Sequence, residues 1–290
     1  MRLVLVHGRE QGRWKDNVDG LRTEWLNALA AGLTAANMPA LSDKVEAVMP
    51  FYGARLDELT EAHRSLEGVP RGASAPGEEF ISEEILLSVA HRAGFTDSDI
   101  QAEIGNPNIP RGPQHWQWVR AAVRLLSQKF PNFGESMMRE FTADVNFYLQ
   151  LPDVRDEING LLVEAIGTEP AVVVGHSLGS IVAYWTLTQR KDLPEVPLFV
   201  TLGSPLGIDV VKRHLPRPLG RPLVVRRWLN AADERDPVAL YPRLDRDIFP
   251  GPDENLSDVH NDRSDPHSIV GYLSDPVVAA RIAEALRGID

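Results

Sequence analysis

The 290-residue sequence contains no cysteine, and this excludes disulfides, thiolate metal sites and a cysteine nucleophile. Long apolar runs are also lacking. The opening run, Met1 to Val6, ends at His7, and no later run approaches the ~18 residues that a membrane span needs. We therefore expect neither a signal peptide nor a transmembrane segment, and take a cytoplasmic location as the default.

Basic residues are few relative to acidic ones. The chain has 30 Lys and Arg against 41 Asp and Glu, a formal net charge of −11. Nucleic acid is held largely through Lys and Arg contacts to phosphates, so we do not expect it as a partner. The remaining composition, 43% hydrophobic and 24% charged, is typical of a globular protein that can bury a large core.

Five short apolar runs, each followed by a loop rich in Gly, Pro or polar residues, predict β-strands. They cover residues 2–6, 44–49, 171–174, 198–202 and 223–229. Helical patterns separate these runs, an alternation typical of a mostly parallel sheet with helices on both faces. The helices expected to flank the sheet lie at 21–33, 154–166, 181–189 and 276–286.

The segment at about 54–150 holds helical patterns but no convincing strand. A plain crossover between parallel strands needs only about a dozen residues, so this segment is too long for that purpose. We expect helices near 78–93, 114–130 and 135–149, with a polar, proline-containing connector at 95–113. The interpretation is one domain over residues 1–290 that carries a helical insertion.

The stretch Gly175-His176-Ser177-Leu178-Gly179 matches the pattern G-x-S-x-G, between a predicted strand and a predicted helix. In this context the pattern predicts a nucleophile elbow, a tight turn whose glycines make room for the serine. The helix N-terminus beside the hydroxyl would stabilise negative charge. Ser177 is therefore a candidate nucleophile, and the alternative is a glycine-rich turn in which Ser177 only caps the helix.

These motifs together resemble the α/β-hydrolase superfamily, specifically its lipase- and esterase-like serine hydrolases. The resemblance rests on His7-Gly8, residues 174–180, Gly203-Ser204-Pro205, Asp236-Pro237-Val238 and Asp265-Pro266-His267. It implies an α/β-hydrolase fold and a catalytic triad in the chain order nucleophile, acid, histidine. One departure is that the first strand already leads into the His-Gly loop, so we expect a sheet shortened at its N-terminal edge.

A catalytic serine needs a base that a third group orients. His267 lies in a polar loop where the resembling family keeps its histidine, and His260 is the alternative. The acid should follow the last long strand, where Asp233, Glu234 and Asp236 stand. The resemblance favours Asp236, because the family's acid immediately precedes Pro-Val, while Asp233 remains the alternative.

An oxyanion hole needs two backbone N–H donors, and the resemblance assigns them to Leu178 and Arg9. Gly8 is expected to let its loop approach closely. His176 is expected to pack or hydrogen-bond beside the substrate. No metal or organic cofactor is expected.

The expected activity is hydrolysis of a carboxylic ester, a small-molecule or lipid-like substrate, through an acyl-enzyme. The insertion would cap the site, with Trp116 and Met138 lining an apolar acyl pocket, although such apolar helix faces are also typical of a core. Thioester or amide hydrolysis and acyl transfer stay open, because the same triad serves them all. A catalytically silent binding protein is the alternative of another class.

Overall fold

The computed structural model describes residues 1–8, 14, 17–66, 79–112, 116–130 and 135–288. At several helical positions, including Trp116 and Met138, the side chain lies outside what is described. The chain forms two compact units. One comprises Met1–Ala54, Asp156–Gly207 and Leu215–Asp290, and the other comprises Arg55–Arg155 and Ile208–His214.

The first unit is built on a six-stranded sheet, in the order β2-β1-β3-β4-β5-β6. The strands are β1 (Arg2–Val6), β2 (Glu46–Val48), β3 (Ala171–His176), β4 (Val196–Leu202), β5 (Val225–Ala231) and β6 (Glu254–Leu256). All five neighbouring pairs are parallel, so the predicted α/β fold class is confirmed. The strand order reverses between β1 and β3, and the carboxyl ends beside such a reversal are where open α/β sheets bind ligands.

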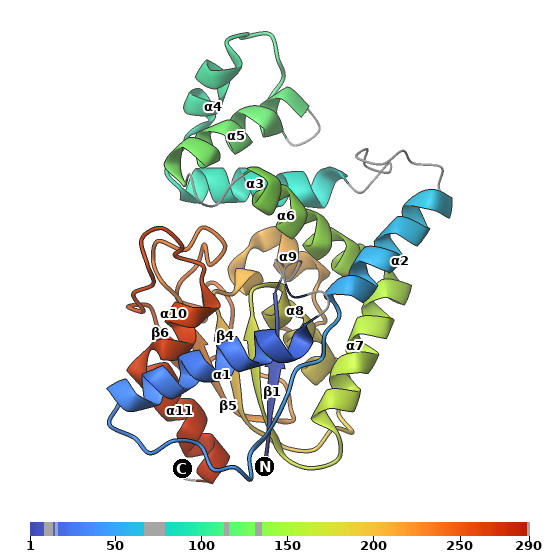
Figure 1. Cartoon of the computed structure of the whole chain (residues 1–290). Helices are drawn as coiled ribbons and strands as arrows, with labels where there is room; N and C mark the ends of the chain where they lie inside the picture. The colour runs from blue at the N-terminus through green and yellow to red at the C-terminus, as the bar shows by residue number, and fades with distance from the viewer. Residues whose placement is uncertain (9–13, 15–16, 67–78, 113–115, 131–134, 289–290) are drawn as a thin grey trace. The chain divides into compact units, whose positions relative to one another are not determined.

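Helices cover both faces of this sheet (Figure 1). Alternate strand residues such as Leu3 and Val172 join one buried cluster with α1 (Val18–Ala35), α10 (Ile269–Ser274) and α11 (Pro276–Arg287). The side chains between them point to the opposite face, because successive residues of a strand alternate. There the Trp228 ring packs 5.5 Å from that of Tyr184 on α8 (Leu178–Gln189), and Thr186 of α8 bonds Asn159 on α7 (Pro152–Ile166).

The sixth strand corrects the expectation of five. β6 lies in a stretch for which no strand was predicted, and it pairs only with β5, at the edge of the sheet. A three-residue edge strand needs no apolar run, since its side chains are only half-buried. The predicted strand at 223–229 also lies two residues later, because the Val225 N–H closes a turn onto the Pro222 carbonyl, 3.0 Å away.

The second unit is helical. Its helices are α3 (Glu79–Arg92), α4 (Asp97–Ile104), α5 (Trp116–Lys129), α6 (Glu135–Gln150) and α9 (Asp209–His214), and α2 (Gly53–Leu66) begins in the first unit. α3 packs on α5 and α6, and α4 packs on α5. Helix α4 lies within residues 95–113, where only a polar, proline-containing connector was predicted. Thr96 and Asp99 form a capping box at its start, and Gly105 ends it in the left-handed conformation.

None of the described helices combines the length and the apolar composition that crossing a bilayer requires.

Candidate active site

Ser177 occupies the turn between β3 and α8 with unusual backbone angles, φ 55° and ψ −127°. A non-glycine residue rarely adopts a positive φ, so the surrounding contacts must hold it there. The Ser177 N–H donates to the Leu202 carbonyl at 3.1 Å. Its own carbonyl accepts the Ser180 N–H at 3.0 Å and the Ser180 hydroxyl at 2.6 Å. Neighbouring strands and the first helical turn therefore fix the position of Ser177.

The space around this turn explains two of its glycines. A Cβ added to Gly179 would lie 2.1 Å from the Val6 carbonyl oxygen, so α8 can approach β1 only without a side chain there. A Cβ added to Gly8 would lie 2.6 Å from the Cβ of Ser177. The loop that follows β1 thus approaches the serine as closely as was expected from the sequence.

Asp236 and His267 are brought together by a hydrogen bond of 2.7 Å between Oδ2 and Nδ1. Asp236 follows β5, and His267 lies in the loop that leads into α10. Because Nδ1 faces a carboxylate, it carries the proton, and Nε2 of His267 is left as the basic nitrogen.

The carboxylate of Asp236 is fully buried, and its other contacts keep it ionised. Oδ1 accepts the N–H groups of Val238 at 2.8 Å and Ala239 at 3.2 Å, and Oδ2 also accepts the Tyr272 hydroxyl at 2.7 Å. Burial alone would raise the pKa of Asp236. The interactions with His267, Tyr272 and the Val238 N–H outweigh burial and hold that pKa below its usual value.

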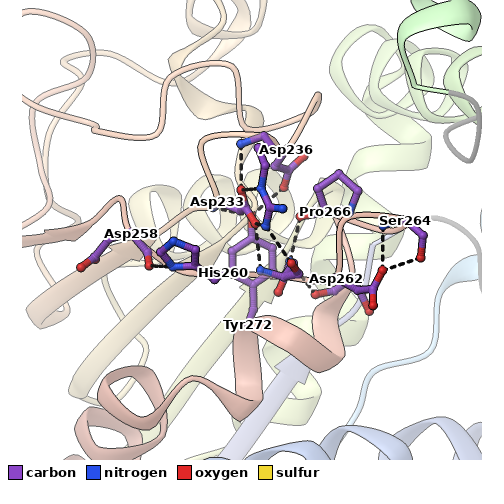
Figure 2. Close-up of polar contacts among 11 residues, drawn as sticks. Asp233, Asp236, Asp258, His260, Asp262, Ser264, Pro266 and Tyr272 are labelled. Carbon is purple, nitrogen blue, oxygen red and sulfur yellow. Dashed lines mark hydrogen bonds and ion pairs between the residues drawn. The ribbon is translucent and has the colours of Figure 1, made fainter.

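The alternative acid, Asp233, has different partners, shown beside Asp236 in Figure 2. The Arg235 guanidinium donates to both of its carboxylate oxygens, at 3.0 and 2.6 Å, and the Asn261 N–H donates to Oδ2 at 2.8 Å. Burial opposes ionisation here, but Arg235 and Asn261 outweigh it and lower the pKa of Asp233. Glu234, the third acid considered, is exposed.

The alternative base, His260, is exposed, and its Nδ1 lies 2.5 Å from the Asp258 carbonyl oxygen (Figure 2). Of the candidate acids and bases, the structure therefore pairs Asp236 with His267.

His176 links the end of β3 to the His267 loop. Its Nε2 lies 2.9 Å from the His267 carbonyl oxygen and must donate the proton, and the two imidazole rings are 4.5 Å apart. Burial, together with the nearby charge of His267, lowers the pKa of His176 from 6.5 to about 3. His176 is therefore neutral near pH 7. Since Ser177 is the next residue, this contact places the serine in the neighbourhood of His267.

His7 makes a similar link at the carboxyl end of β1. Its Nδ1 donates to the Gly8 carbonyl at 2.7 Å, and its Nε2 accepts the Tyr52 N–H at 3.2 Å. Burial lowers the pKa of His7 to about 4, so this ring is also neutral near pH 7. Both nitrogens are occupied, so this ring ties its loop to the Tyr52 backbone and is not placed to act as a base.

Three of the residues predicted to form the site are not described. Arg9 lies outside the described residues, as do the side chains of Trp116 and Met138, so their roles stay predictions. Leu178, the other expected oxyanion donor, is the first residue of α8, where N–H groups have no partner within the helix.

Tyr272 and Asn261 were not foreseen from the sequence. Tyr272 is the one tyrosine of the short apolar helix α10, and this pattern indicates a core residue. Asn261 joins the acid turn to the histidine loop: its N–H bonds Asp233, and its side-chain amide donates to the carbonyls of Pro266 at 2.7 Å and Ser268 at 3.1 Å. Among the described residues, no group of three His, Asp or Glu side chains is arranged to hold a metal.

Comparison with known proteins agrees with this architecture. The model of the alpha/beta hydrolase family matches residues 105–287, which is more than half of the chain and includes Ser177, Asp236 and His267. The chain therefore belongs to the alpha/beta hydrolase family, and its class of activity is that of a hydrolase. No curated protein and no solved structure gave a match.

Proposed function

We propose that the protein hydrolyses carboxylic esters through an acyl-enzyme formed on Ser177. The observation that carries the proposal is the buried Asp236–His267 hydrogen bond, in the same neighbourhood as a serine held at a strained strand-to-helix turn. Acyl transfer requires a serine and a histidine whose Nδ1 is held by an ionised acid, and all three residues follow strands at the carboxyl ends of the parallel sheet. The substrate would be a small-molecule or lipid-like ester.

In the first half-reaction, the Ser177 hydroxyl oxygen attacks the acyl carbon while Nε2 of His267 takes the hydroxyl proton. Asp236 stabilises the resulting imidazolium through Nδ1. The N–H groups of Leu178 and Arg9 would stabilise the oxyanion. When the C–O bond breaks, His267 returns the proton to the departing alcohol. Water then repeats the sequence on the acyl-enzyme, which releases the acid and restores Ser177.

A fluorophosphonate probe tests this proposal, because it labels only an activated serine. We expect labelling and ester turnover in the wild-type protein, and loss of both in Ser177→Ala with the fold unchanged. Ser268→Ala is the matched control: it is a partly buried serine next to His267 whose hydroxyl makes no capping hydrogen bond. That variant should be labelled like the wild type.

The leaving group is tested by a panel of matched esters, thioesters and anilides with one acyl chain. Faster turnover of the esters supports ester hydrolysis, whereas labelling with turnover of thioesters alone would reassign the leaving group. A folded wild-type protein that is neither labelled nor active on any of them would overturn the proposal and favour a silent binding protein. The cytoplasmic location and the capping role of the helical insertion stay predictions.

A further inference from the structure

Two side chains donate to the same carboxylate oxygen of Asp236. Nδ1 of His267 and the hydroxyl of Tyr272 each lie 2.7 Å from Oδ2. Both donors lie on one short stretch of chain, since His267 immediately precedes Ser268, the N-cap of α10, and Tyr272 lies within that helix. Tyr272 is fully buried, and Figure 2 shows it beneath the turn that carries Asp233 and Asp236.

The direction of the Tyr272 hydroxyl proton is fixed by a third contact. The Asp233 N–H donates to the Tyr272 oxygen at 3.0 Å, so the hydroxyl is an acceptor toward Asp233 and its own proton points to Asp236. Burial and the negative charge of Asp236 raise the pKa of Tyr272 well above its ordinary value, so the hydroxyl keeps its proton.

We propose that Tyr272 is a positioning residue of the hydrolase, which fixes the Asp236 carboxylate and weakens its hold on the His267 proton. The proposal rests on the proposed catalytic roles of Asp236 and His267. With Tyr272 in place, the carboxylate accepts four hydrogen bonds, two at each oxygen, and thus cannot rotate without losing one. A merely packed tyrosine would fill the same space without these effects.

The hydroxyl also changes the charge that His267 meets. A hydrogen bond to Oδ2 draws negative charge away from that oxygen, so the imidazolium form of His267 is stabilised less than by a bare carboxylate. The other ionisable groups in contact are His176, whose ring lies 6.0 Å from that of Tyr272, and Asp233, whose charge Arg235 compensates. Removing the hydroxyl should therefore move the acid limb of the pH profile of kcat/KM to higher pH.

The test is Tyr272→Phe, with Tyr184→Phe as the matched control. Tyr184 is also a buried tyrosine. Its hydroxyl accepts the Gly220 N–H, and Gly220 lies outside the loops that carry Asp236 and His267. We expect Tyr272→Phe to lower kcat/KM by about tenfold, the usual size of a lost hydrogen bond to a charged group, and to move the acid limb upward by about half a pH unit. Tyr184→Phe should leave the acid limb unchanged.

A loss of kcat/KM in Tyr272→Phe without movement of the acid limb would overturn the proposal, because it would reduce Tyr272 to a packing role. An equal movement in Tyr184→Phe would do the same.

Proton NMR of the wild-type protein gives a second measurement, which needs neither turnover nor a folded variant. The Tyr272 hydroxyl proton should exchange slowly and show a cross-relaxation peak to the Nδ1 proton of His267, since both lie on one oxygen. Absence of that peak would overturn the inference even if Tyr272→Phe failed to fold. Its presence in a protein without Ser177-dependent turnover would instead locate the failure in the proposed ester hydrolysis.

Discussion

At the scale of the residue, Asp233 and Asp236 lie in one turn but bind different kinds of side chain. Asp236 faces a histidine and a tyrosine in a fully buried site, whereas Asp233 is bound by a partly exposed arginine. Both are ionised, but only the charge of Asp236 can stabilise a positive charge that forms on His267 during a reaction. Mutation of each should therefore separate the proposed catalytic carboxylate from a structural one.

We expect Asp236→Asn to lower kcat by about 10⁴-fold, the effect known when a triad acid loses its charge. Asp233→Asn should change kcat far less. It should instead lower the free energy of unfolding by about 1–3 kcal/mol, because the buried Asn261 N–H and Arg235 lose their charged acceptor. Steady-state kinetics and urea unfolding of both variants measure these effects. The reverse ranking in kcat would make Asp233 the acid.

The sequence predicted the serine more directly than its partners, because the elbow is local. Five consecutive residues determine that turn. The last of them, Gly179, has to be a glycine because a side chain there would clash with the Val6 carbonyl. The pairing of Asp236 with His267 depends on how two distant loops meet, so a resemblance to known hydrolases was needed to select them. No sequence motif marks Tyr272 as a partner of the acid. The packing of α10 alone decides whether its hydroxyl contacts a carboxylate or water.

At the scale of the element, α10 and α11 show how the end of the chain is attached. Asp275 begins α11 and accepts the N–H groups of Val277 at 2.9 Å and Val278 at 3.0 Å. Ser268 begins α10 without such a bond. The two N-cap residues can therefore be compared: the Asp275 side chain accepts capping hydrogen bonds, and the Ser268 side chain accepts none.

We expect Asp275→Ala to lower the free energy of unfolding by about 1 kcal/mol, as for other lost caps, with kcat unchanged. Ser268→Ala should leave stability within about half of that value, because no capping bond is removed. Urea unfolding measures both. Equal losses in the two variants would contradict the assignment of the cap to Asp275.

The elements missed from the sequence are short or polar. β6 has only three residues, Glu254–Leu256, and no apolar run marks it. α4 buries a single residue, Ile100, and its start signal, a threonine followed three residues later by an aspartate, stood in a stretch dominated by polar residues. By contrast β3 and β4 are buried on nearly every residue, so their apolar runs were sufficient.

At the scale of the whole molecule, the two buried histidines should make the protein sensitive to acid. Their pKa values fall from 6.5 to about 4 for His7 and about 3 for His176. Between 6.5 and those values the unfolded chain binds more protons than the native one, so stability is lost as the pH falls below 6.5. Each histidine contributes a slope of up to about 1.4 kcal/mol per pH unit.

We expect the free energy of unfolding to be roughly 3–4 kcal/mol lower at about pH 5 than at about pH 7 from these two groups together. Urea unfolding across this range measures the loss. His176→Asn should remove about half of the pH dependence, because one of the two groups is gone, while His260→Asn, an exposed control, should retain it. An unchanged slope in His176→Asn would mean that the pKa of His176 is not lowered in the native protein.

The order of strands in the sheet also affects how the protein is made. Arg2 in β1 pairs with Ala171 in β3, so β1 acquires this neighbour only after the helices α1 to α7, which lie between them in the sequence, are synthesised. At synthesis rates of about 5–20 residues per second, that delay is roughly 10–30 s. Until then β1 has only the three-residue β2 beside it, and two strands alone are marginally stable in water.

A nascent chain that stops before β3 should therefore present an apolar strand, Leu3 to Val6, that a chaperone can bind. Synthesis of β3 ends this exposure. The strand that covers β1 is also the one that leads directly into Ser177, so the β1–β3 pair and the turn of the candidate nucleophile become available to the growing chain together.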